Sequence, residues 1–145
     1  MYTTDTPVGP VTLWERDGAI TAVRFCAVKD SVPTPLLLEA AEELREYFAG
    51  TRREFTVPLA PEGSEFSKRV WDALLRIPYG QRAAYGDIAR EIGSPKASRA
   101  IGGACHRNPI AVFIPCHRVT AKSGEGGYAY GAEIKRFLLE LEKHA

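Results

Sequence analysis

The chain has 145 residues, of which 45% are hydrophobic and 26% are charged, and its formal net charge is +1. This size and composition indicate a folded chain with one core, or with a small lobe packed on a larger one. No apolar run approaches the roughly 20 residues that span a bilayer, and no secretion signal opens the chain, so we expect a cytoplasmic protein without a membrane partner.

The first predicted elements form a small N-terminal lobe. In VGPVTLWERDGAITAVRF, two apolar runs flank Asp17-Gly18, a dipeptide that suits a tight hairpin turn, so two antiparallel strands are expected. Residues 33–50 follow with a proline entry, apolar residues at helical spacing and Gly50 as the stop, which predicts an amphipathic helix on that sheet. We expect residues 1–60 to form this α/β lobe, and none of its motifs carries chemistry.

Three helices are expected between residues 64 and 106. Ser64 is a suitable N-cap for a core helix that runs to Leu75, because apolar residues recur there with helical spacing. A short helix ends at Gly93, and another begins with Ser94 as its N-cap and Pro95 in its first turn. Two short helices joined by a tight turn are typical of a helix-turn-helix.

The last predicted elements are a strand, a loop and a closing helix. The apolar run PIAVFIP, residues 109–115, predicts a strand bounded by prolines, and Cys116 follows it directly. Because Pro115 restricts the backbone, we expect the chain to change direction there and to form a turn or short helical stretch at Cys116. Residues 122–133 are a Gly/Tyr-rich loop, and residues 134–145 predict an amphipathic helix.

Charge is divided unevenly along the chain. Residues 1–62 carry 6 Lys/Arg and 10 Asp/Glu, a net −4, whereas residues 66–124 carry 10 and 3, a net +7. The basic segment either faces a polyanion or merely solvates a surface. The second helix of the pair is rich in small residues, and each of its two glycines costs about 1 kcal/mol relative to Ala. Helix packing or the close approach of a nucleic acid would each explain them.

The three cysteines, Cys26, Cys105 and Cys116, are too few and too irregularly spaced for a disulfide framework. For Cys116 the residues leave three interpretations: a buried structural side chain, a metal ligand beside Cys105-His106 and His117, or a nucleophile. Adjacent Cys-His pairs are poor spacing for zinc. A nucleophilic thiol needs a basic neighbour or a helix N-terminus to ionise at neutral pH, and sequence spacing alone establishes neither.

The motifs IPCHRV, RAIGG…NP and YGDIA…GSPKASRA together resemble the O6-alkylguanine-DNA alkyltransferases, which repair alkylated DNA and are consumed by the reaction. The similarity runs from residue 66 to residue 142, and residues 1–60 are similar in outline only. It implies an α/β (α+β) fold and an intracellular protein of the prokaryotic type. A small RNase H-like α/β lobe would precede a winged helix-turn-helix-like alkyltransferase domain at residues 63–145.

The resemblance implies a chemical role for four residues. Cys116 would accept the alkyl group from O6 of guanine, or from O4 of thymine, in one irreversible displacement. His117 would take the thiol proton through a water, and the Glu142 carboxylate would orient that histidine. Tyr85 would supply a phenol to meet the charge on the departing base.

The resemblance also implies that the small-residue helix enters the minor groove of double-stranded DNA and that the damaged nucleotide is flipped out of the stack. Arg99 would fill the gap that the flipped base leaves. Asn108, the single Asn of the chain, would be a structural hinge whose side chain hydrogen-bonds the backbone. The other residues implied in DNA binding are Tyr85, Ser94, Lys96, Ala97, Gly102 and Gly103.

The pocket for the flipped base is implied to include Val119, Tyr128, Ala129 and Lys135. Tyr128 would pack on the purine, the Ala129 backbone would bond near O6, and the carbonyls of Cys116 and Val119 would accept from the amino group. Ala129 stands where some relatives have Ser, which leaves only a backbone contact. Ala111 and Glu125 are positions that bear on the tolerance for bulky O6 groups.

We expect no cofactor and no metal, because Cys26 is the only Cys or His in the lobe where some relatives hold zinc, and we expect a monomer. Three alternatives remain. A non-catalytic lesion binder of similar sequence would carry Trp at the acceptor position. A helix-turn-helix regulator would need only Arg99 and the basic face. A Cys-His hydrolase or redox enzyme would convert many substrate molecules per chain.

Overall fold

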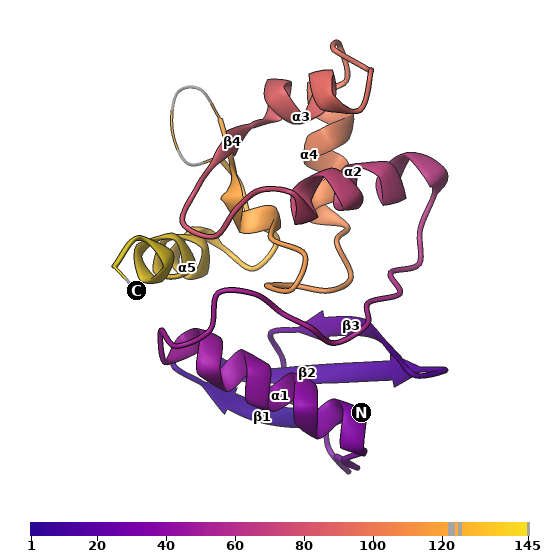
Figure 1. Ribbon diagram of the computed structural model, residues 1–145, viewed down its shortest axis with the longest axis vertical. Helices are drawn as coiled ribbons and strands as arrows, with labels where there is room; N and C mark the ends of the chain where they lie inside the picture. Colours follow the sequence, from indigo (N-terminus) through magenta and orange to yellow (C-terminus); the bar gives the residue numbers. More distant parts are fainter. Residues whose placement is uncertain (122–123, 125, 145) are drawn as a thin grey trace. The chain divides into compact units, whose positions relative to one another are not determined.

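The computed structural model of the protein describes residues 1–121, 124 and 126–144 (Figure 1). Lys122, Ser123, Glu125 and Ala145 lie outside this part, so Glu125, one of the two positions that bear on bulky O6 groups, is not described, whereas the other, Ala111, is buried. The chain divides into two units, the first made of Met1–Glu62 and Pro109–Phe113 and the second of Gly63–Asn108 and Ile114–His144. The second unit is therefore not a continuous stretch of sequence. Within the described residues, no helix is both long enough and apolar enough to cross a membrane.

The first unit is an antiparallel sheet with one helix. The strands β1 (Tyr2–Thr6), β2 (Gly9–Arg16) and β3 (Ala19–Arg24) pair in that order. The hairpin predicted around Asp17-Gly18 is confirmed, and both residues have positive φ, 52° and 79°. The strand β1 was not predicted, because the five residues YTTDT show no apolar alternation.

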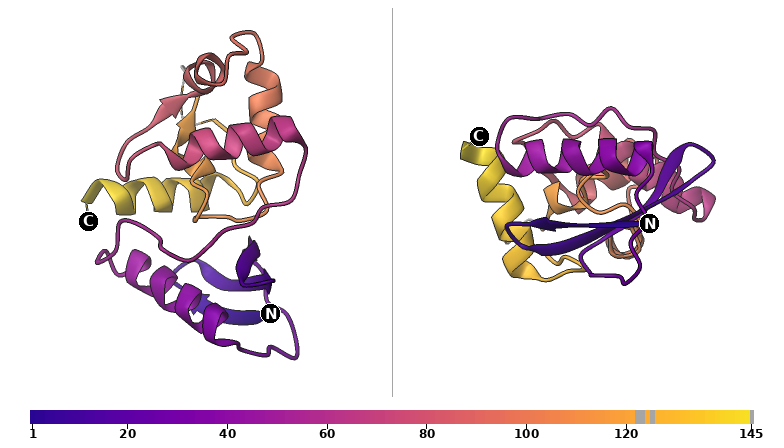
Figure 2. Two further views of the ribbon diagram at one scale, coloured as in Figure 1. Left: turned by 45° about the vertical axis from the view of Figure 1, so that its right-hand side comes forward. Right: turned by 90° about the horizontal axis from the view of Figure 1, so that it is seen from below.

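The helix α1 (Pro35–Phe48) covers one face of that sheet, as Figures 1 and 2 show. Thr34 caps its N-terminus and accepts the Leu37 amide at 3.2 Å, and Pro35 occupies the first turn. Gly50 follows the last turn with φ of 79°, which confirms the predicted stop. The buried face of α1 and the inward residues of β2 and β3 form the core of this unit.

The strand predicted at residues 109–115 is wrong. Only Ile110 makes a bridge, to Val23 of β3, where the Val23 amide donates to the Pro109 carbonyl at 2.9 Å. Val112 then takes a φ of 70°, and the Phe113 amide donates to the Ala111 carbonyl at 2.8 Å. A residue in the left-handed region reverses the chain and prevents further strand pairing, which an apolar pattern alone does not reveal.

The second unit contains the remaining helices and two short strands. They are α2 (Glu65–Leu75), β4 (Ala83–Ala84), α3 (Tyr85–Glu91), α4 (Ser98–His106), the 3-10 helix η1 (Cys116–Arg118), β5 (Val119–Thr120) and α5 (Ala132–His144). Ser64 caps α2 as predicted, with its Oγ accepting the Ser67 amide at 3.1 Å. The strands β4 and β5 pair in parallel, so the residue before β4 lies beside the end of η1 and the start of α3 lies beside Ala121.

The helix pair α3 and α4 is present, but the predicted N-cap at Ser94 is wrong. The Ala97 amide donates to the Ser94 carbonyl at 2.9 Å, so residues 94–97 close a turn before the helix starts. Pro95 disfavours helical backbone at the residue before it, and α4 begins only at Ser98. Ala97 is the N-cap and has no side-chain acceptor to offer.

Gly63 is the residue of this unit whose replacement tests the packing most directly. A Cβ on Gly63 would lie 2.5 Å from Cη2 and 2.8 Å from Cζ3 of Trp71. Trp71 is 2% exposed, and its Nε1 donates to the Ala104 carbonyl at 3.0 Å, so the ring has no free direction in which to move. We expect Gly63→Ala to lower the free energy of unfolding by about 1–3 kcal/mol in urea titrations.

Gly124→Ala is the matched control, because nothing lies within 4 Å of a Cβ placed there. Its free energy of unfolding should stay within about 0.5 kcal/mol of the wild-type value. Equal stability of the two variants would contradict the close packing of Trp71 on Gly63.

Candidate functional site

Cys116 lies at a sharp change of chain direction. Pro115 has φ −82° and ψ 61°, and the Cys116 amide donates to the Ile114 carbonyl at 2.8 Å, which is the geometry of an inverse γ-turn. The 3-10 helix η1 begins at Cys116, and the Arg118 amide donates to the Pro115 carbonyl at 3.0 Å. The turn or short helical stretch predicted at Pro115 is confirmed. Cys116 is 6% exposed at this turn.

A small cavity of about 90 Å³ reaches Cys116. Its walls come from α3, α4, η1 and the loop before α5, and they are formed by Tyr85, Gly102, Cys105, His106, Cys116, Gly127, Tyr128 and Ala129. Five of these were predicted as site residues from the sequence, whereas Cys105 and His106 were considered only as possible metal ligands and Gly127 was not predicted. Cys105 could have been found, because it stands one helical turn after Gly102 and so shares its face of α4.

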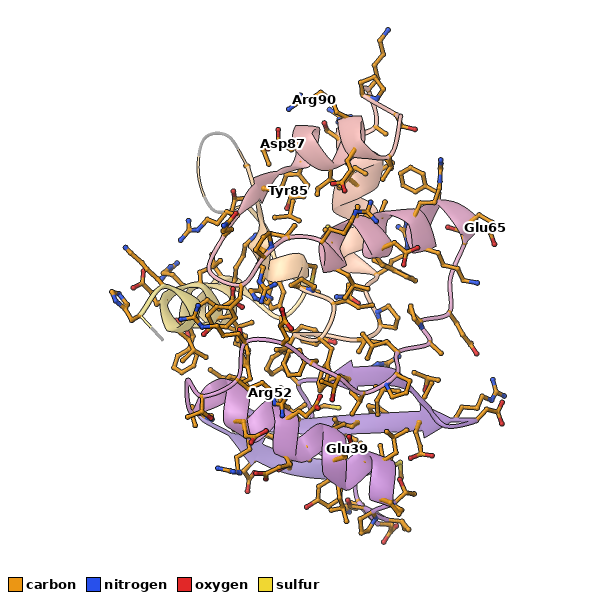
Figure 3. All side chains as sticks on the ribbon, viewed as in Figure 1. Glu39, Arg52, Glu65, Tyr85, Asp87 and Arg90 are labelled. Carbon is orange, nitrogen blue, oxygen red and sulfur yellow. The ribbon has the colours of Figure 1, made fainter. Side chains whose placement is uncertain are left out.

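Tyr85 is the first residue of α3, and its side chain reaches this cavity. Figure 3 labels it at the start of that helix. Gly126, with φ of 76°, lets the loop pass close to the ring, since a Cβ there would lie 3.1 Å from the Tyr85 hydroxyl. Burial raises the pKa of the Tyr85 phenol, against a smaller lowering by a backbone hydrogen bond at Gly127. At neutral pH this phenol therefore carries its proton.

The Cys116 thiol is protonated in the resting site. Burial raises its pKa to about 11, although a hydrogen bond from Asn108 and the charge of Lys135 lower it. The Asn108 Nδ2 donates to the Ile114 carbonyl at 2.8 Å and lies 3.2 Å from the Cys116 sulfur. The chain leaves the second unit after Asn108 and returns to it at Ile114. The Asn108 amide therefore links these two points of the chain. The neighbouring thiol of Cys105 has a pKa of about 12, raised by burial and by Cys116.

His117 lies behind Cys116 and is completely buried. Its Nε2 is 2.6 Å from Oε2 of Glu142 in α5. Burial raises the pKa of Glu142, but hydrogen bonds from His117 and Arg118 lower it more strongly, to about 2, so the carboxylate is ionised at pH 7. Since an ionised carboxylate only accepts hydrogen bonds, His117 carries its proton on Nε2.

The other imidazole nitrogen of His117 is then a lone-pair acceptor. Within the described part of the chain, Nδ1 has no hydrogen-bond partner. Burial lowers the pKa of His117, while the Glu142 hydrogen bond opposes that shift, so the ring is neutral at pH 7. A neutral, buried imidazole with a free lone pair has the properties of a general base.

Val119 and Lys135 lie beside the cavity rather than among the described residues that line it. Lys135 is 1% exposed, and its ammonium donates to the Val119 carbonyl at 2.6 Å and to the Gly127 carbonyl at 3.0 Å. Lys135 therefore ties β5 and the loop before α5 to the inner face of that helix. Its contact with Val119 uses the carbonyl that the resemblance had implied for the base.

Apart from Tyr85 on α3, the residues implied in DNA binding lie on α4 and the turn that precedes it. Arg99 and Lys96 are exposed, whereas Ser94, Ala97, Gly102 and Gly103 are half-buried. Gly102 also faces Tyr85, because a Cβ there would lie 3.9 Å from the tyrosine ring. The same helix thus presents an exposed arginine in its first turn and a cavity wall that begins one turn later, at Gly102.

Among the described residues, no group of three or more His, Cys, Asp or Glu side chains is arranged to hold a metal ion. Cys26, Cys105 and Cys116 are all free thiols.

The low pKa of Glu142 contributes stability that depends on pH. Because this pKa is lower in the folded chain than its ordinary value of 4.5, the contribution is complete above that value and disappears as the pH falls through about 2. We expect Glu142→Gln to lower the free energy of unfolding by about 3 kcal/mol at neutral pH, and the difference to shrink steadily in acid. Urea unfolding of both proteins across this pH range measures it.

Glu140→Gln on the same helix is the control, since the ion pair that Glu140 makes among the described residues, with His144 at 3.2 Å, is exposed. It should change stability by less than about 1 kcal/mol at any pH. A loss in Glu142→Gln that stayed constant down to the lowest pH would contradict an ionised, hydrogen-bonded carboxylate.

Both units match known protein families. Residues 65–144 match the 6-O-methylguanine DNA methyltransferase, DNA binding domain, and residues 1–61 match the 6-O-methylguanine DNA methyltransferase, ribonuclease-like domain. The fold is thus a ribonuclease-like domain followed by a DNA-binding domain in a mixed α/β chain, as the sequence analysis predicted.

Relatives match over nearly the whole chain. The methylated-DNA–protein-cysteine methyltransferase of Methanosarcina acetivorans is 47% identical over 147 residues, which is 95% of this chain and 94% of the relative. The constitutive enzyme of that name from Bacillus subtilis is 45% identical and covers 98% and 94%. A crystal structure of Mycobacterium tuberculosis OGT in complex with DNA aligns with a TM-score of 0.90 at 46% identity, covering 98% of this chain and 91% of that one. This chain belongs to the family of methylated-DNA–protein-cysteine methyltransferases, the 6-O-methylguanine DNA methyltransferases.

Proposed function

We propose that this protein repairs DNA by moving the alkyl group of O6-alkylguanine onto the sulfur of Cys116. The observation that carries the proposal is the position of Cys116 at the wall of a cavity that Tyr85 and Tyr128 also line, with the neutral His117 next to it in sequence. An isolated structural cysteine would need neither the cavity nor a buried base.

The proposed reaction is a single displacement. A carbon–sulfur bond forms at Cys116 while the bond from that carbon to guanine O6 breaks, and the thiol proton passes through a water to Nδ1 of His117. The neutral state of His117 and its proton on Nε2 support this direction of transfer. A resting thiol with a pKa of about 11 indicates that ionisation accompanies substrate binding rather than preceding it.

The departing guanine needs a proton or a donor for the electrons it keeps. Tyr85 is the proposed source, because it lines the same cavity and its raised pKa keeps the phenol protonated until the base demands the proton. Tyr128 and the backbone of Ala129 line the wall against which the purine would pack. The thioether that results has no leaving group to return, so one molecule would repair one lesion.

Access to a base within a duplex requires flipping, and α4 is the proposed DNA-reading element. The 65–144 match to a DNA-binding domain and the DNA complex of the Mycobacterium tuberculosis relative support a duplex partner. The exposed Arg99 would occupy the space of the flipped nucleotide and delay its return. The small residues Ala97, Gly102 and Gly103 would let the minor groove approach the helix, and Ser94 and Lys96 would contact the strand beside it.

Mass spectrometry of the intact chain and of its peptides tests the proposed function. After incubation with a duplex containing O6-methylguanine, we expect a gain of one methyl group located on Cys116, in a stoichiometry that does not exceed one per chain. Cys116→Ser should remain unmodified, while the matched variant Cys26→Ser, whose thiol belongs to the first unit and is not among the cavity-lining residues, should be methylated like the wild type. An unmodified wild-type chain, or one that released a product repeatedly, would refute the proposal.

Arg99→Ala tests the proposed flipping step. Flipping costs a few kcal/mol, so we expect loss of the arginine to slow methyl transfer from duplex DNA by roughly tenfold or more. Transfer from the free base O6-benzylguanine needs no flipping and should be nearly unchanged. Arg16→Ala, an exposed arginine of the first unit, controls for the loss of charge. An equal loss with both substrates would count against the role of Arg99.

A further inference from the structure

Arg118 is a buried residue of η1 that lies outside the cavity lining and that the proposed reaction has not used. It is 7% exposed, and its guanidinium makes a two-pronged contact with Glu142. The distances are 2.8 Å from Nε to Oε1 and 3.1 Å from Nη2 to Oε2. A planar guanidinium bound in this way fixes the plane of the carboxylate as well as its position.

The carboxylate of Glu142 is shared between Arg118 and the proposed base. Its Oε2 accepts from Nη2 of Arg118 and from Nε2 of His117, the latter at 2.6 Å. Its Oε1 accepts from Nε of Arg118 and from the Gly80 amide at 3.3 Å. One carboxylate therefore receives hydrogen bonds from an arginine, an imidazole and the backbone.

The part of the Arg118 guanidinium that does not contact Glu142 is also bound. Its Nη1 donates to the Ile77 carbonyl at 2.8 Å, and its guanidinium carbon lies 5.6 Å from the centre of the Tyr79 ring. Both residues belong to the segment between α2 and β4. Because η1, α5 and this segment meet at one guanidinium, Glu142 has no freedom to turn away from His117.

The charges around His117 show why this matters for the reaction. Glu142 favours the imidazolium, whereas burial and the charges of Arg118 and Lys135 favour the neutral ring. Without Arg118, the carboxylate would face His117 as an unshared negative charge in a buried site, and such a pair holds a proton tightly. A protonated imidazole cannot receive the thiol proton.

We propose that Arg118 is a positioning residue for the alkyl transfer: it holds Glu142 in the orientation that fixes the His117 proton on Nε2, and it shares the charge of the carboxylate so that the imidazole remains a free base. This inference rests on the proposed function, since it describes how that reaction obtains its base. A lysine at this position would keep the charge but lose the two-pronged contact.

Two variants separate the roles of charge and of geometry. In Arg118→Gln the charge is gone, so the pKa of His117 rises and the acid limb of the transfer rate against pH moves to higher pH by roughly one unit or more. In Arg118→Lys the limb moves less, because a charge remains. Its rate on the plateau falls roughly tenfold or more, because a single ammonium does not hold both carboxylate oxygens. Arg16→Gln is the matched control and should follow the wild type.

Single-turnover methylation of Cys116 by duplex DNA, measured between about pH 5 and pH 9, gives the rates. Titration of the imidazole nitrogens of His117 by ¹⁵N NMR in the full chain gives its pKa and proton position without any substrate. Urea unfolding of each variant gives its stability. A merely structural arginine would lower stability and scale the rate equally at every pH, with no shift of the acid limb.

The proposal is overturned if Arg118→Gln keeps the wild-type acid limb and the wild-type His117 titration, or if Arg118→Lys keeps the wild-type plateau rate. If Arg118→Gln does not fold, Arg118→Lys decides by its plateau rate and by the ¹⁵N signals of His117. A wild-type chain that takes up no methyl group refutes the proposed function instead, and the NMR titration still tests the effect of Arg118 on His117.

Discussion

The ionised carboxylate of Glu142, buried under η1, is the constraint on which the rest of the site depends. Lys135 lies two turns earlier on the same buried face of α5. Together the two side chains hold η1 and the segments around it. Glu142 binds the side chains of His117 and Arg118, and Lys135 binds the carbonyls of Val119 and Gly127. A single helix thus fixes both the His117 imidazole and the loop that lines the cavity.

The elements that sequence reasoning recovered are those whose signals are local. The hairpin at Asp17-Gly18, the capped helix after Ser64 and the stop at Gly50 each rest on one turn or one cap, and each is present. The predictions that were wrong also rested on local signals, which the conformation of the folded chain overrules. The apolar run after Asn108 has the composition of a strand, but Val112 adopts positive φ and ends the pairing.

The candidate site divides in the same way. The change of direction at Pro115 followed from the conformational limits of proline, so the turn at Cys116 was predictable from the residues themselves. The pairing of His117 with Glu142 joins positions 25 apart and had no signal in spacing; it was reached only through the family resemblance. Arg118 was missed although it stands beside His117, because nothing in a sequence distinguishes a buried arginine from a solvated one.

The turn at Cys116 has a further chemical consequence, which follows from the raised pKa of its sulfur. Small diffusible electrophiles and peroxides react with thiolates far faster than with thiols, and they arrive without the contacts that would ionise a buried group. Under the proposed function each chain reacts once, so any such encounter would end its use. A sulfur that stays a thiol until a purine fills the adjoining cavity would be reserved for the alkylated base.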